Sequence, residues 1–463
     1  MKRVLFIAYY FPPIGGSGTQ RPAKFVKYLP QFGWQPYVIS TDRPYGDGAE
    51  GRDETLLADI LAGVQVWRVP TPQPQPVYRL ASGVGWRSRQ AVATIGSIGA
   101  PADNLGATVA PLSLVTRLRR ALLAPLYLVQ DPPVDPALYW ALRIVPLARE
   151  IIRREQIDVV LTTVPPWSAL IAGALLRRLT GRPWVADFRD PWSDNTFIYF
   201  PSPVRRRFDQ WLEHCLLDRA DAVISVTLPV LEGLRRKTRR ADKPFVLIPN
   251  GWDRDDFPDL AAVRNGLPPP ASVDDRIVLL HPGSAYQGEP LPLLEALDRL
   301  AAEGVALDRL CFHFIGYMHP EDRQAIGTSP HARLFWLNPQ RVPHDQALRL
   351  MRDAHVLLLL LLRKGPDASS GKIFEYMVAG RPVLASGAPE GVAGQMVRTC
   401  GIGRVVAPED VGEMARVLWQ VVEDYHRFVE ESYRPNWSEI EQYERRALTG
   451  KLVETINEVL GRS

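Results

Sequence analysis

Short apolar segments alternate with amphipathic segments along most of the chain. Residues 1–10 read as a strand, residues 21–33 as a helix and residues 34–41 as a second strand, with short connections between them. Two consecutive strands joined through a helix run parallel. In the rest of the first half, strands are predicted over residues 157–163, 182–188, 221–227 and 244–251, and helices over residues 168–181 and 208–220.

The alternation starts again in the second half. Strands are predicted over residues 275–283, 310–317, 333–338, 356–362 and 381–386, and helices over residues 291–304 and 344–355. Residues 250–275, between the halves, are rich in Asp, Pro and Gly and favour a boundary. We therefore predict an α/β protein with two Rossmann-like, doubly wound parallel sheets. Its parts are a first domain over residues 1–254, a linker over 255–274, a second domain over 275–435 and a closing helix over 436–463.

Two segments need separate comment. Residues 70–113 are of low complexity, which predicts a long mobile insertion in the first domain. Residues 436–460 read as one helix, in which Ser438 and Glu441 have the spacing of a capping box.

The composition is that of a globular protein. The chain has 463 residues, 46% of them hydrophobic, which is enough for two cores. The longest apolar run, residues 356–362, is far shorter than the roughly 18 residues that span a bilayer. The opening residues lack the cleavage site of a signal peptide, so a cytoplasmic location is expected. Cys215, Cys311 and Cys400 are too scattered to predict a disulfide or a metal site.

Charge is unevenly distributed along the chain. Residues 1–250 carry 32 Lys and Arg against 21 Asp and Glu, whereas residues 251–463 carry 23 against 30. Arginines cluster at 205–207 and 235–243, and at 117–129 they adjoin apolar residues. These clusters are either solvated faces or contacts for an anionic membrane surface or acceptor. No nucleic-acid-binding motif accompanies them, so a nucleic-acid partner is not expected.

The stretch DASSGKIFEYMVAGRPVLA, residues 367–385, places a lysine in the first turn of a predicted helix. Unpaired N–H groups and the helix dipole disfavour Lys372 there by about 0.3–1 kcal/mol. The residues that would cap this helix are Ser369, Ser370 and Gly371. Glu375 shares a helix face with Lys372, and a ligand with an anionic end and a hydroxylated end would suit that face. Alternatively, Glu375 simply pairs with Lys372 on a solvated surface.

A glycine-rich loop, FPPIGGSGTQR, follows the first strand. Gly15, Gly16 and Gly18 let the backbone approach a ligand closely and turn N–H groups toward an anion, and we predict that Gly15 and Gly16 bind the donor; a plain tight turn is the alternative. The dinucleotide fingerprint is absent, because Arg21 stands where its last glycine belongs. GPDASSGKI is not a Walker A loop either, because Ile373 replaces the hydroxyl that binds Mg²⁺.

Four segments, taken in order, resemble the retaining glycosyltransferases of family 4. They are FIAYYFPPIGGSGTQRPAKFVKYL, RPWVADFRDPW, VISVT with VLIPNGWD, and SSGKIFEYMVAGRPVLA. The resemblance implies the GT-B fold, a nucleotide-sugar donor held mainly by the second domain and an acceptor held mainly by the first. It also implies no catalytic metal, no cofactor besides the nucleoside-diphosphate-sugar co-substrate, and a closing helix that crosses back to the first domain.

The resemblance assigns roles to particular residues. The two acidic positions of the family fall on Asp367 and Glu375, which would contact the donor sugar and the ribose hydroxyls, respectively. Lys372, with the N–H groups of residues 369–371, would hold the diphosphate. Relatives usually carry an arginine and a lysine in the loop after the first strand of the second domain. The residues found in that loop here are Gly283, Ser284 and Tyr286.

A second departure lies in ADFRDPW, where relatives commonly have a histidine and this chain has Arg189. Arg189 would stabilise the leaving phosphate, and Asp190 would orient the acceptor hydroxyl or the sugar. The alternative is an Asp187–Arg189–Asp190 ion network that only shapes the end of the strand.

The resemblance implies sugar transfer to an acceptor hydroxyl with retention, by same-face attack assisted by the departing phosphate, whose growing charge fixed cations and helix N–H groups would stabilise. The leading hypothesis places it in bacterial surface-polysaccharide or glycolipid assembly, with a lipid-linked or anionic acceptor and peripheral contact with the inner face of the plasma membrane. The alternatives are a soluble transferase for a small metabolite or natural product, and a catalytically silent nucleotide-sugar-binding subunit.

Overall fold

The protein folds into two α/β units, each built on one parallel sheet. Unit 1 comprises Met1–Ile248 and Gly450–Ser463, and unit 2 comprises Pro249–Thr449. The computed structural model describes residues 1–44, 51–72, 134–195, 198, 200, 202–240, 242–266, 275–361, 365–367 and 369–462. Most of the predicted insertion, from residue 73 onward, lies outside the described residues, as do the segment 117–129 and the end of the predicted linker.

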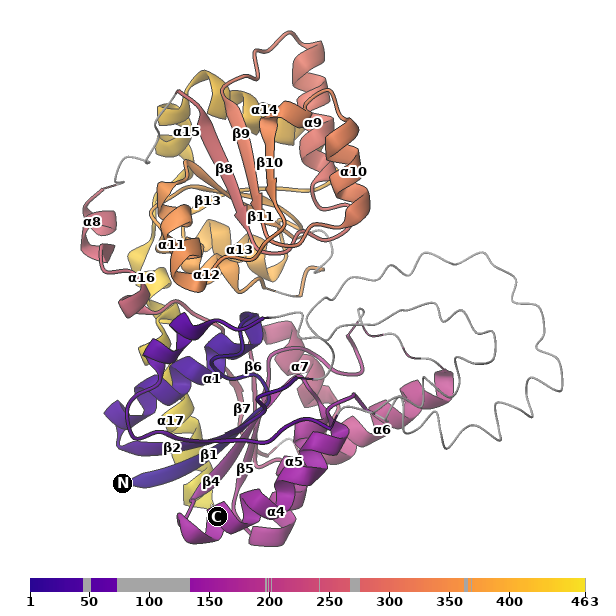
Figure 1. Cartoon of the computed structure of the whole chain (residues 1–463), viewed down its shortest axis with the longest axis vertical. Coiled ribbons are helices and arrows are strands. Elements are labelled where there is room, and N and C mark those ends of the chain that lie inside the picture. Colours follow the sequence, from indigo (N-terminus) through magenta and orange to yellow (C-terminus); the bar gives the residue numbers. More distant parts are fainter. Residues whose placement is uncertain are drawn as a thin grey trace, which may run out of the picture. The chain divides into compact units, whose positions relative to one another are not determined.

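Seven strands form the sheet of unit 1, in the order β3-β2-β1-β4-β5-β6-β7 (Figure 1). They are β1 (Lys2–Ala8), β2 (Trp34–Ser40), β3 (Gln65–Arg68), β4 (Val159–Val164), β5 (Trp184–Phe188), β6 (Ala222–Ser225) and β7 (Phe245–Leu247). The helices are α1 (Ser17–Tyr28), α4 (Leu138–Arg154), α5 (Ser168–Thr180), α6 (Pro203–Arg219) and α7 (Leu228–Arg236), with 3₁₀ turns η1 (Leu29–Phe32) and η2 (Glu54–Asp59).

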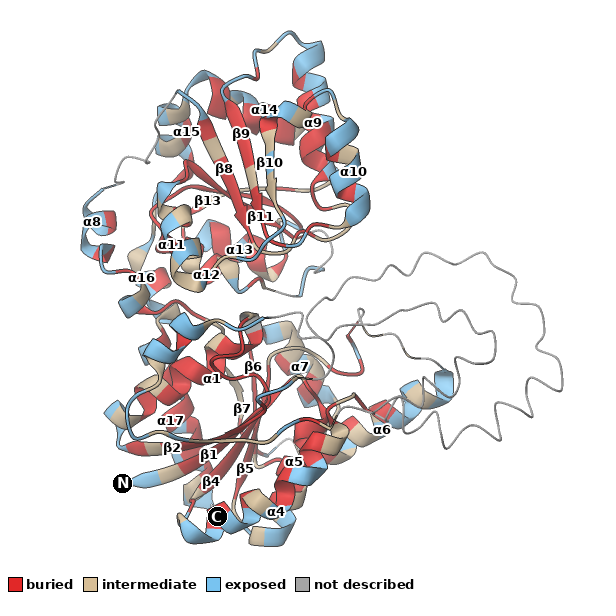
Figure 2. Ribbon diagram, viewed as in Figure 1, coloured by how far each residue is buried: buried red, intermediate tan, exposed pale blue. Residues whose placement is uncertain are grey.

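The strands of unit 1 are apolar because helices cover the sheet. Figure 2 shows its strands as mostly buried. Leu5 and Ile7 of β1 pack in one core cluster with Trp140 and Ile144 of α4 and Leu170 of α5. Parallel strands covered on both faces are expected to read as continuous Val, Ile and Leu runs, which is the pattern that predicted them.

The last residues of the chain belong to unit 1. Helix α17 (Arg445–Arg462) begins in unit 2 and ends in unit 1. The Lys2 ammonium donates to Asn457 Oδ1 at 2.7 Å, and Arg462 Nη1 donates to the Asp242 carbonyl at 2.6 Å. The chain therefore returns to its first unit, as the resemblance implied.

Six strands form the sheet of unit 2, in the order β10-β9-β8-β11-β12-β13. They are β8 (Ile277–Pro282), β9 (Leu310–Ile315), β10 (Phe335–Asn338), β11 (Val356–Leu360), β12 (Val383–Ser386) and β13 (Gly403–Val406). The helices are α8 (Leu260–Asn265), α9 (Leu291–Ala302), α10 (Pro320–Thr328), α11 (His344–Asp353), α12 (Lys372–Tyr376), α13 (Val392–Thr399), α14 (Val411–Glu423), α15 (Tyr425–Ser432) and α16 (Trp437–Ile440). Three 3₁₀ turns complete the list: η3 (Arg254–Asp256), η4 (Ala332–Leu334) and η5 (Glu441–Tyr443).

Two core clusters cover the two faces of this second sheet. Leu279 and Leu358 pack with α9 and α14 on one face, and Leu280 and Leu357 pack with α11, α12 and α13 on the other. Neighbouring residues of one strand point to opposite faces, which explains why adjacent leucines join different clusters. The predicted α/β fold with two doubly wound parallel sheets is confirmed.

The closing segment differs from its prediction. Residues 436–460 are not one helix but α16, η5 and the greater part of α17. Ser438 lies inside α16, where its hydroxyl donates to Asn436 Oδ1 at 2.7 Å, so the predicted capping box does not form. The chain turns here because Trp252 N–H donates to the Tyr443 carbonyl (3.1 Å) and Arg445 N–H donates to the Trp252 carbonyl (2.8 Å).

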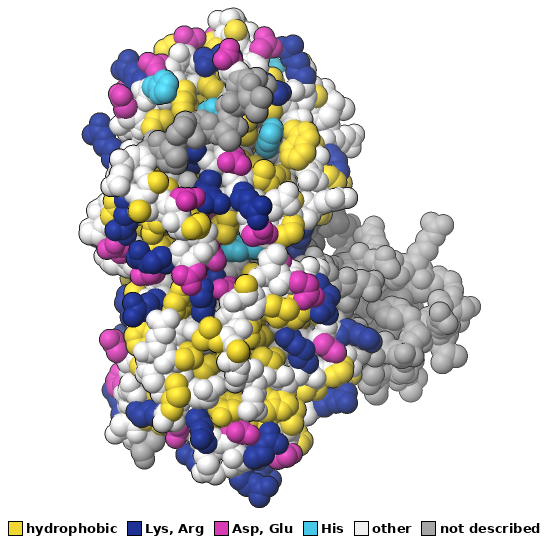
Figure 3. All heavy atoms as spheres, turned by 60° about the vertical axis from the view of Figure 1, so that its left-hand side comes forward, with side chains coloured by type: hydrophobic (Ala, Val, Ile, Leu, Met, Phe, Trp, Pro, Cys, Tyr) yellow, Lys and Arg dark blue, Asp and Glu magenta, His cyan; other side chains and the backbone are white. Residues whose placement is uncertain are grey.

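The structure was inspected for surface charge, membrane-spanning helices and free thiols because the sequence raised each of these points. On the face drawn in Figure 3, basic and acidic side chains of the described residues intermingle and form no continuous patch of one sign. Within the described part of the chain, no helix has the length and apolar character needed to cross a membrane. Cys311 and Cys400 are buried free thiols, and Cys215 is a partly exposed one.

Candidate functional site

The strand order of each sheet decides where the candidate residues meet. In unit 2 the order reverses between β8 and β11, and in unit 1 it reverses between β1 and β4. Ligands of open α/β sheets bind beyond the carboxyl ends of the strands at such a switch point. The loop after β8 carries Gly283, Ser284 and Tyr286, and the segment after β11 leads to Lys372, so unit 2 brings these predicted residues to one edge of its sheet.

Lys372 contacts a buried histidine. Its ammonium lies 2.8 Å from His281 Nε2 and 3.4 Å from the Ser284 carbonyl oxygen. His281 has no exposed surface, and its Nδ1 lies 3.1 Å from the Leu358 carbonyl of β11. His281 Nε2 also lies 3.1 Å from the Ser284 carbonyl oxygen, so the ring and the ammonium of Lys372 meet at the same carbonyl. With the ring proton on Nδ1, where the Leu358 carbonyl accepts it, Nε2 can accept from Lys372. A neutral imidazole accepts this hydrogen bond without cancelling the positive charge of the lysine.

Glycine at position 283 makes room for the lysine side chain. Gly283 has φ +111°, a conformation that L side chains rarely adopt. A Cβ there would lie 2.7 Å from Lys372 Cε and 3.1 Å from Nζ. The Gly283 N–H donates to the Ile315 carbonyl at 2.6 Å, so the loop is anchored on β9. The absence of a side chain at residue 283 therefore allows the ammonium of Lys372 to reach His281.

Buried carboxylates shape the rest of the loop after β8. The Tyr286 N–H donates to Glu289 Oε2 at 2.9 Å, and the Gly288 N–H lies 3.0 Å from both carboxylate oxygens of Asp322. Glu289 and Asp322 are 1% and 2% exposed. The loop conformation is thus set by side chains that point inward, and Ser284 and Tyr286 remain partly exposed.

Glu375 lies one turn after Lys372 and contacts a different histidine. Its Oε1 lies 2.9 Å from Nε2 of His344, the first residue of α11. Both side chains are partly exposed, at 22% for Glu375 and 17% for His344. The interaction orients the carboxylate toward the beginning of α11 and leaves its other oxygen available to accept hydrogen bonds.

The helix that begins at Lys372 is short. Helix α12 has only 5 residues, and its N-cap is Gly371, without a side-chain capping bond. The predicted cap by the hydroxyls of Ser369 and Ser370 is therefore not formed. So short a helix has a weak dipole, and the electrostatic cost that we assigned to Lys372 is correspondingly small.

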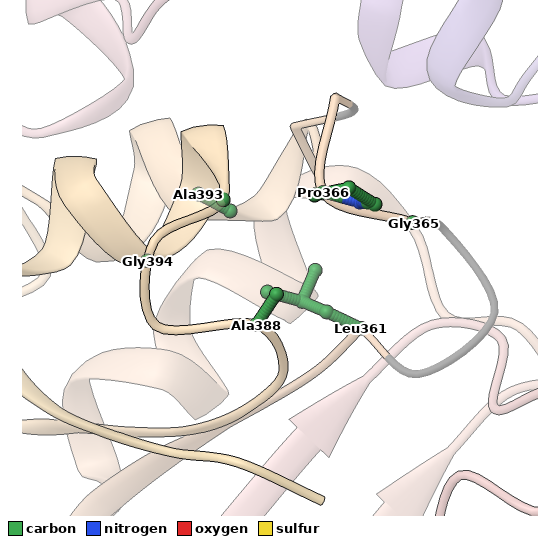
Figure 4. Close-up of a pocket in the computed structure, with 7 residues that line it drawn as sticks. Leu361, Gly365, Pro366, Ala388, Ala393 and Gly394 are labelled. Atoms are coloured by element: carbon green, nitrogen blue, oxygen red, sulfur yellow. The ribbon is translucent and has the colours of Figure 1, made fainter.

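The segment before α12 is tied to α13. The Val392 N–H donates to the Pro366 carbonyl at 2.8 Å, and a Cβ at Gly391 would lie 3.0 Å from Pro366 Cα. Asp367 is exposed beside this contact, Ser369 is half-buried and Ser370 is buried. A small cavity of about 10 Å³ lies here (Figure 4), lined by Leu361, Gly365, Pro366, Ala388, Gly391, Ala393 and Gly394. It is about the size of one water molecule and is too small for a sugar.

In unit 1, the glycine-rich loop after β1 meets Arg189. Gly16, with φ +96°, is the N-cap of α1. The Gly15 N–H donates to the Gly51 carbonyl at 3.0 Å, so this N–H is already used within the protein. Arg189 Nη2 donates to the Pro165 carbonyl at 2.6 Å, and a Cβ at Gly18 would lie 2.5 Å from Arg189 Nη1. The guanidinium therefore lies against the beginning of α1.

The alternative prediction, an ion network of Asp187, Arg189 and Asp190 at the end of β5, is wrong because Asp187 pairs with another residue. Its partner is Arg21 of α1, which forms a two-pronged ion pair at 2.8–3.1 Å. Both side chains are almost completely buried, at 0% and 1% exposure. Arg189 uses the Pro165 carbonyl instead, and Asp190 is half-buried next to it. Arg189 and Asp190 therefore remain candidates for a role in chemistry.

A buried carboxylate supports the loop that holds Arg189. Asp135 accepts from the Ser168 N–H (2.8 Å), the Ser168 hydroxyl (2.7 Å) and the Ala137 N–H (2.9 Å). Burial raises the pKa of Asp135 to about 6, and the hydrogen bonds from Ser168 and Ala137 oppose that rise. Asp135 thereby joins the beginning of α4 to the beginning of α5, directly after the 165–167 turn.

Sequence reasoning missed the two histidines that contact Lys372 and Glu375. His281 is the next-to-last residue of an otherwise apolar strand, and His344 opens a helix, each of which is a common place for a polar residue. The only sequence signal was that a polar side chain at the carboxyl end of a parallel strand lies near the ligand edge of the sheet.

Comparisons with known proteins bear on this geometry. The model of glycosyltransferase family 4 matches residues 113–256, and no curated protein matches the chain. The α,α-trehalose-phosphate synthase (UDP-forming) of Burkholderia vietnamiensis has a similar structure, with a TM-score of 0.61 at 14% identity over 100% of both chains. The lipopolysaccharide outer core galactosyltransferase WaaB has a TM-score of 0.54 at 13% identity, over 98% of this chain and 99% of its own.

The protein is a glycosyltransferase with the GT-B fold. The family match identifies the class of enzyme, and the similar structures show the fold. A Listeria monocytogenes protein assigned as a UDP-N-acetylglucosamine 2-epimerase has the same fold, with a TM-score of 0.53 at 13% identity over 100% of this chain and 98% of its own. Because this fold also serves epimerases, the roles of individual residues in this glycosyltransferase have to be argued from its own site.

Proposed function

We propose that this glycosyltransferase moves a sugar from a nucleoside-diphosphate-sugar to an acceptor hydroxyl, with unit 2 holding the donor. The observation that carries the proposal is the ammonium of Lys372, held by His281 at the switch point of the unit 2 sheet. A positive charge fixed by a neutral partner is suited to bind a diphosphate and to stabilise the charge that grows on it as the sugar leaves.

The other donor contacts follow from the positions of the neighbouring side chains. Glu375 accepts hydrogen bonds from the ribose hydroxyls, and His344 orients its carboxylate. Asp367, exposed in the segment before α12, contacts the donor sugar. Backbone N–H groups surround the diphosphate, and the residues that would supply them or line the site are Gly283, Ser284, Tyr286, Ser369, Ser370 and Gly371.

We assign the acceptor side to unit 1. Arg189 places a guanidinium at the beginning of α1, next to the loop of Gly15 and Gly16, where an anionic group would find a cation and a close backbone. Asp190, beside it, orients the acceptor hydroxyl. Retention by same-face attack, with no metal, is proposed from the resemblance to family 4.

The donor base and the pathway are also proposals. The name of the B. vietnamiensis enzyme includes UDP, and that of WaaB includes lipopolysaccharide, so we propose a UDP-sugar donor and a role in surface-polysaccharide or glycolipid assembly. A small-molecule acceptor is the alternative. A catalytically silent subunit would bind the donor without turnover.

Ligand binding by variants tests the donor site. UDP, GDP, ADP and uridine are titrated calorimetrically into the whole protein and into Lys372→Ala, Glu375→Gln and Arg333→Ala. Arg333 is an exposed arginine of unit 2 that pairs with Asp308. Arg333→Ala therefore removes one positive charge, as Lys372→Ala does, and serves as the control. Lys372→Ala is expected to weaken UDP binding at least tenfold and uridine binding little, since a charge-assisted hydrogen bond contributes about 1.5–3 kcal/mol. Equal UDP affinity in Lys372→Ala and Arg333→Ala would reject the site.

Turnover then separates enzyme from silent subunit. UDP release from UDP-sugars is followed with and without extracted membrane lipids as acceptors. Release that depends on the lipid extract supports a glycolipid acceptor. Donor binding without release under any condition would leave the binding site standing but reject the proposed transfer.

A further inference from the structure

Helix α6 turns two carboxylates into the protein. The residues that it buries are Asp209, Glu213, Leu216 and Leu217. Asp209 and Glu213 are only 1% and 0% exposed. A surface helix normally keeps its charged side chains in water, and a carboxylate is buried only where it is paired. The partners of these two carboxylates therefore indicate what α6 holds in place.

Both carboxylates hold the segment that follows β5, defined here as residues 189–195. The indole N–H of Trp192 donates to Asp209. The hydroxyl of Ser193, the next residue, donates to Glu213 Oε2. Trp192 and Ser193 are 0% and 1% exposed, so both contacts are shielded from water. Successive turns of α6 thus bind successive residues of the 189–195 segment.

A lysine completes this network. Lys237, at the end of α7, places its ammonium 2.8 Å from Glu213 Oε2 and 3.0 Å from the Ser193 hydroxyl. The same ammonium lies 2.7 Å from Asp194 Oδ2. Within the described part of the chain, Glu213 Oε1 has no hydrogen-bond partner, so Oε2 connects α6, α7 and the 189–195 segment. Because a buried ion pair adds little net stability, its geometric effect explains the network better.

Asp190 lies in the same segment but has no such anchor. Its half-buried carboxylate makes no hydrogen bond or ion pair with any residue that the structure describes. The preceding residue, Arg189, is fixed, since its N–H donates to the Val164 carbonyl at 3.0 Å and its guanidinium to the Pro165 carbonyl at 2.6 Å. The direction of the Asp190 side chain is therefore set by the backbone on either side of it.

We propose that Glu213 positions Asp190 for sugar transfer by holding Ser193. The inference rests on the proposed function, in which Asp190 orients the acceptor hydroxyl. Glu213 is completely buried, so it is a positioning residue rather than a catalytic one. A reacting group that is misplaced by about 1 Å can lower the rate about 100-fold, so an anchor three residues from Asp190 is expected to affect turnover.

Variants of the whole protein test the assignment. Glu213→Gln removes the charge that holds Ser193 and Lys237. Ser193→Ala removes only the link to the 189–195 segment and leaves the pair of Glu213 and Lys237 in place, so it decides the question if Glu213→Gln fails to fold. Asp190→Asn, alone and combined with Glu213→Gln, shows whether Glu213 acts through Asp190.

The control is Asp221→Asn. Asp221 pairs with Arg177 at 2.7 Å and accepts from the N–H of Trp184, the first residue of β5. The change disturbs an ion pair of unit 1 at the amino ends of the strands, whereas the 189–195 segment follows their carboxyl ends. Asp221→Asn and Glu213→Gln are both expected to lower the thermal midpoint, so a loss of stability alone is matched.

Turnover is measured as UDP release from UDP-glucose, UDP-galactose and UDP-N-acetylglucosamine, each with and without extracted membrane lipids. Glu213→Gln should lower kcat about 100-fold and Ser193→Ala about tenfold, with the KM for the UDP-sugar nearly unchanged because unit 2 holds the donor. Asp221→Asn should keep its kcat. In the Asp190→Asn background, Glu213→Gln should lower kcat no further, which a merely structural role would not produce.

Amide hydrogen exchange, followed by mass spectrometry, measures the 189–195 segment directly. Glu213→Gln and Ser193→Ala should exchange at least about tenfold faster in this segment, and Asp221→Asn should not. Unchanged exchange in both would overturn the proposal, as would an equal loss of kcat on Glu213→Gln with and without the change at Asp190.

Failure of the proposed function has a different signature. If the unchanged protein releases no UDP from any of the three donors, the proposed transfer is rejected, and the exchange rates still decide whether Glu213 holds the segment. If Asp190→Asn turns over like the unchanged protein, the assigned role of Asp190 is wrong, and the positioning role of Glu213 is rejected with it.

Discussion

Replacing Gly283 by alanine perturbs the candidate donor site through a single methyl group. The new Cβ would lie 2.7 Å from Lys372 Cε, closer than real Cβ contacts allow, and 3.1 Å from Nζ. The lysine has to move, because its side chain is more flexible than the backbone of the β8 loop. We expect the ammonium of Lys372, which lies 2.8 Å from His281 Nε2, to lose this contact.

The change has a stability cost and a binding cost. Alanine at φ +111° is strained by about 1–3 kcal/mol, whatever lies around it. Displacing Lys372 from a bound diphosphate would forfeit a charge-assisted hydrogen bond, about 1.5–3 kcal/mol, or roughly 10- to 100-fold in the dissociation constant of UDP. The first cost affects unfolding, and the second affects only the ligand.

A matched glycine separates the two costs. Gly304, also in unit 2, has φ +80° and nothing within 4 Å of its ideal Cβ. Gly304→Ala should lose similar stability in thermal unfolding but keep its affinity for UDP in calorimetry. Gly283→Ala should lose both. In a Lys372→Ala background, Gly283→Ala should cost little further affinity, because the two changes remove the same interaction.

Two outcomes would refute this reasoning. If Gly283→Ala and Gly304→Ala bind UDP equally, the methyl group does not displace the lysine from a phosphate. If Gly283→Ala weakens binding as much without Lys372 as with it, the methyl group meets the ligand itself, and the proposed role of the lysine side chain is wrong.

Further predictions concern His281 and two buried carboxylates. His281→Phe removes the acceptor of the Lys372 ammonium and should weaken UDP binding about tenfold in calorimetry, whereas His281→Gln should retain part of it; equal affinities would contradict the positioning role. Asp187→Asn leaves the Arg21 charge buried without its carboxylate and should cost about 3–5 kcal/mol, or roughly 6–20 °C in thermal midpoint; a loss below 1 kcal/mol would be inconsistent with a buried pair. The pKa of Asp135 is raised from 3.8 to about 6, so the folded state binds a proton that the unfolded state has lost. Its contribution to stability is present at low pH and falls by about 3 kcal/mol as pH rises from about 4 to about 6. The free energy of unfolding of Asp135→Asn, measured with denaturant, should lack this part of the pH dependence. The same pH dependence in Asp135→Asn and the unchanged protein would contradict the assignment to Asp135.

The parallel sheets were predictable because local patterns carry the information. The strand over residues 34–41 is found as β2 (Trp34–Ser40), and the run at 356–362 contains β11 (Val356–Leu360). Buried parallel strands must be apolar on both faces, so they stand out in the sequence. Helix ends were less predictable: α12 is five residues long and α16 stops at Ile440, because contacts from distant segments decide where these helices end.

The sequence alone determined most of the strands, although not β3 or β13, and it marked Lys372 and Glu375 as candidates by their spacing and by a resemblance. Only the tertiary structure decided their partners. His281 is 91 residues from Lys372, and His344 is 31 residues from Glu375. Likewise, Arg21 pairs with Asp187, 166 residues away. Periodicity and turn chemistry act over a few residues, whereas these contacts join segments that are distant in sequence. The Lys372–His281 contact follows from strand order, which brings the ends of β8 and β11 together and is not encoded in any local pattern.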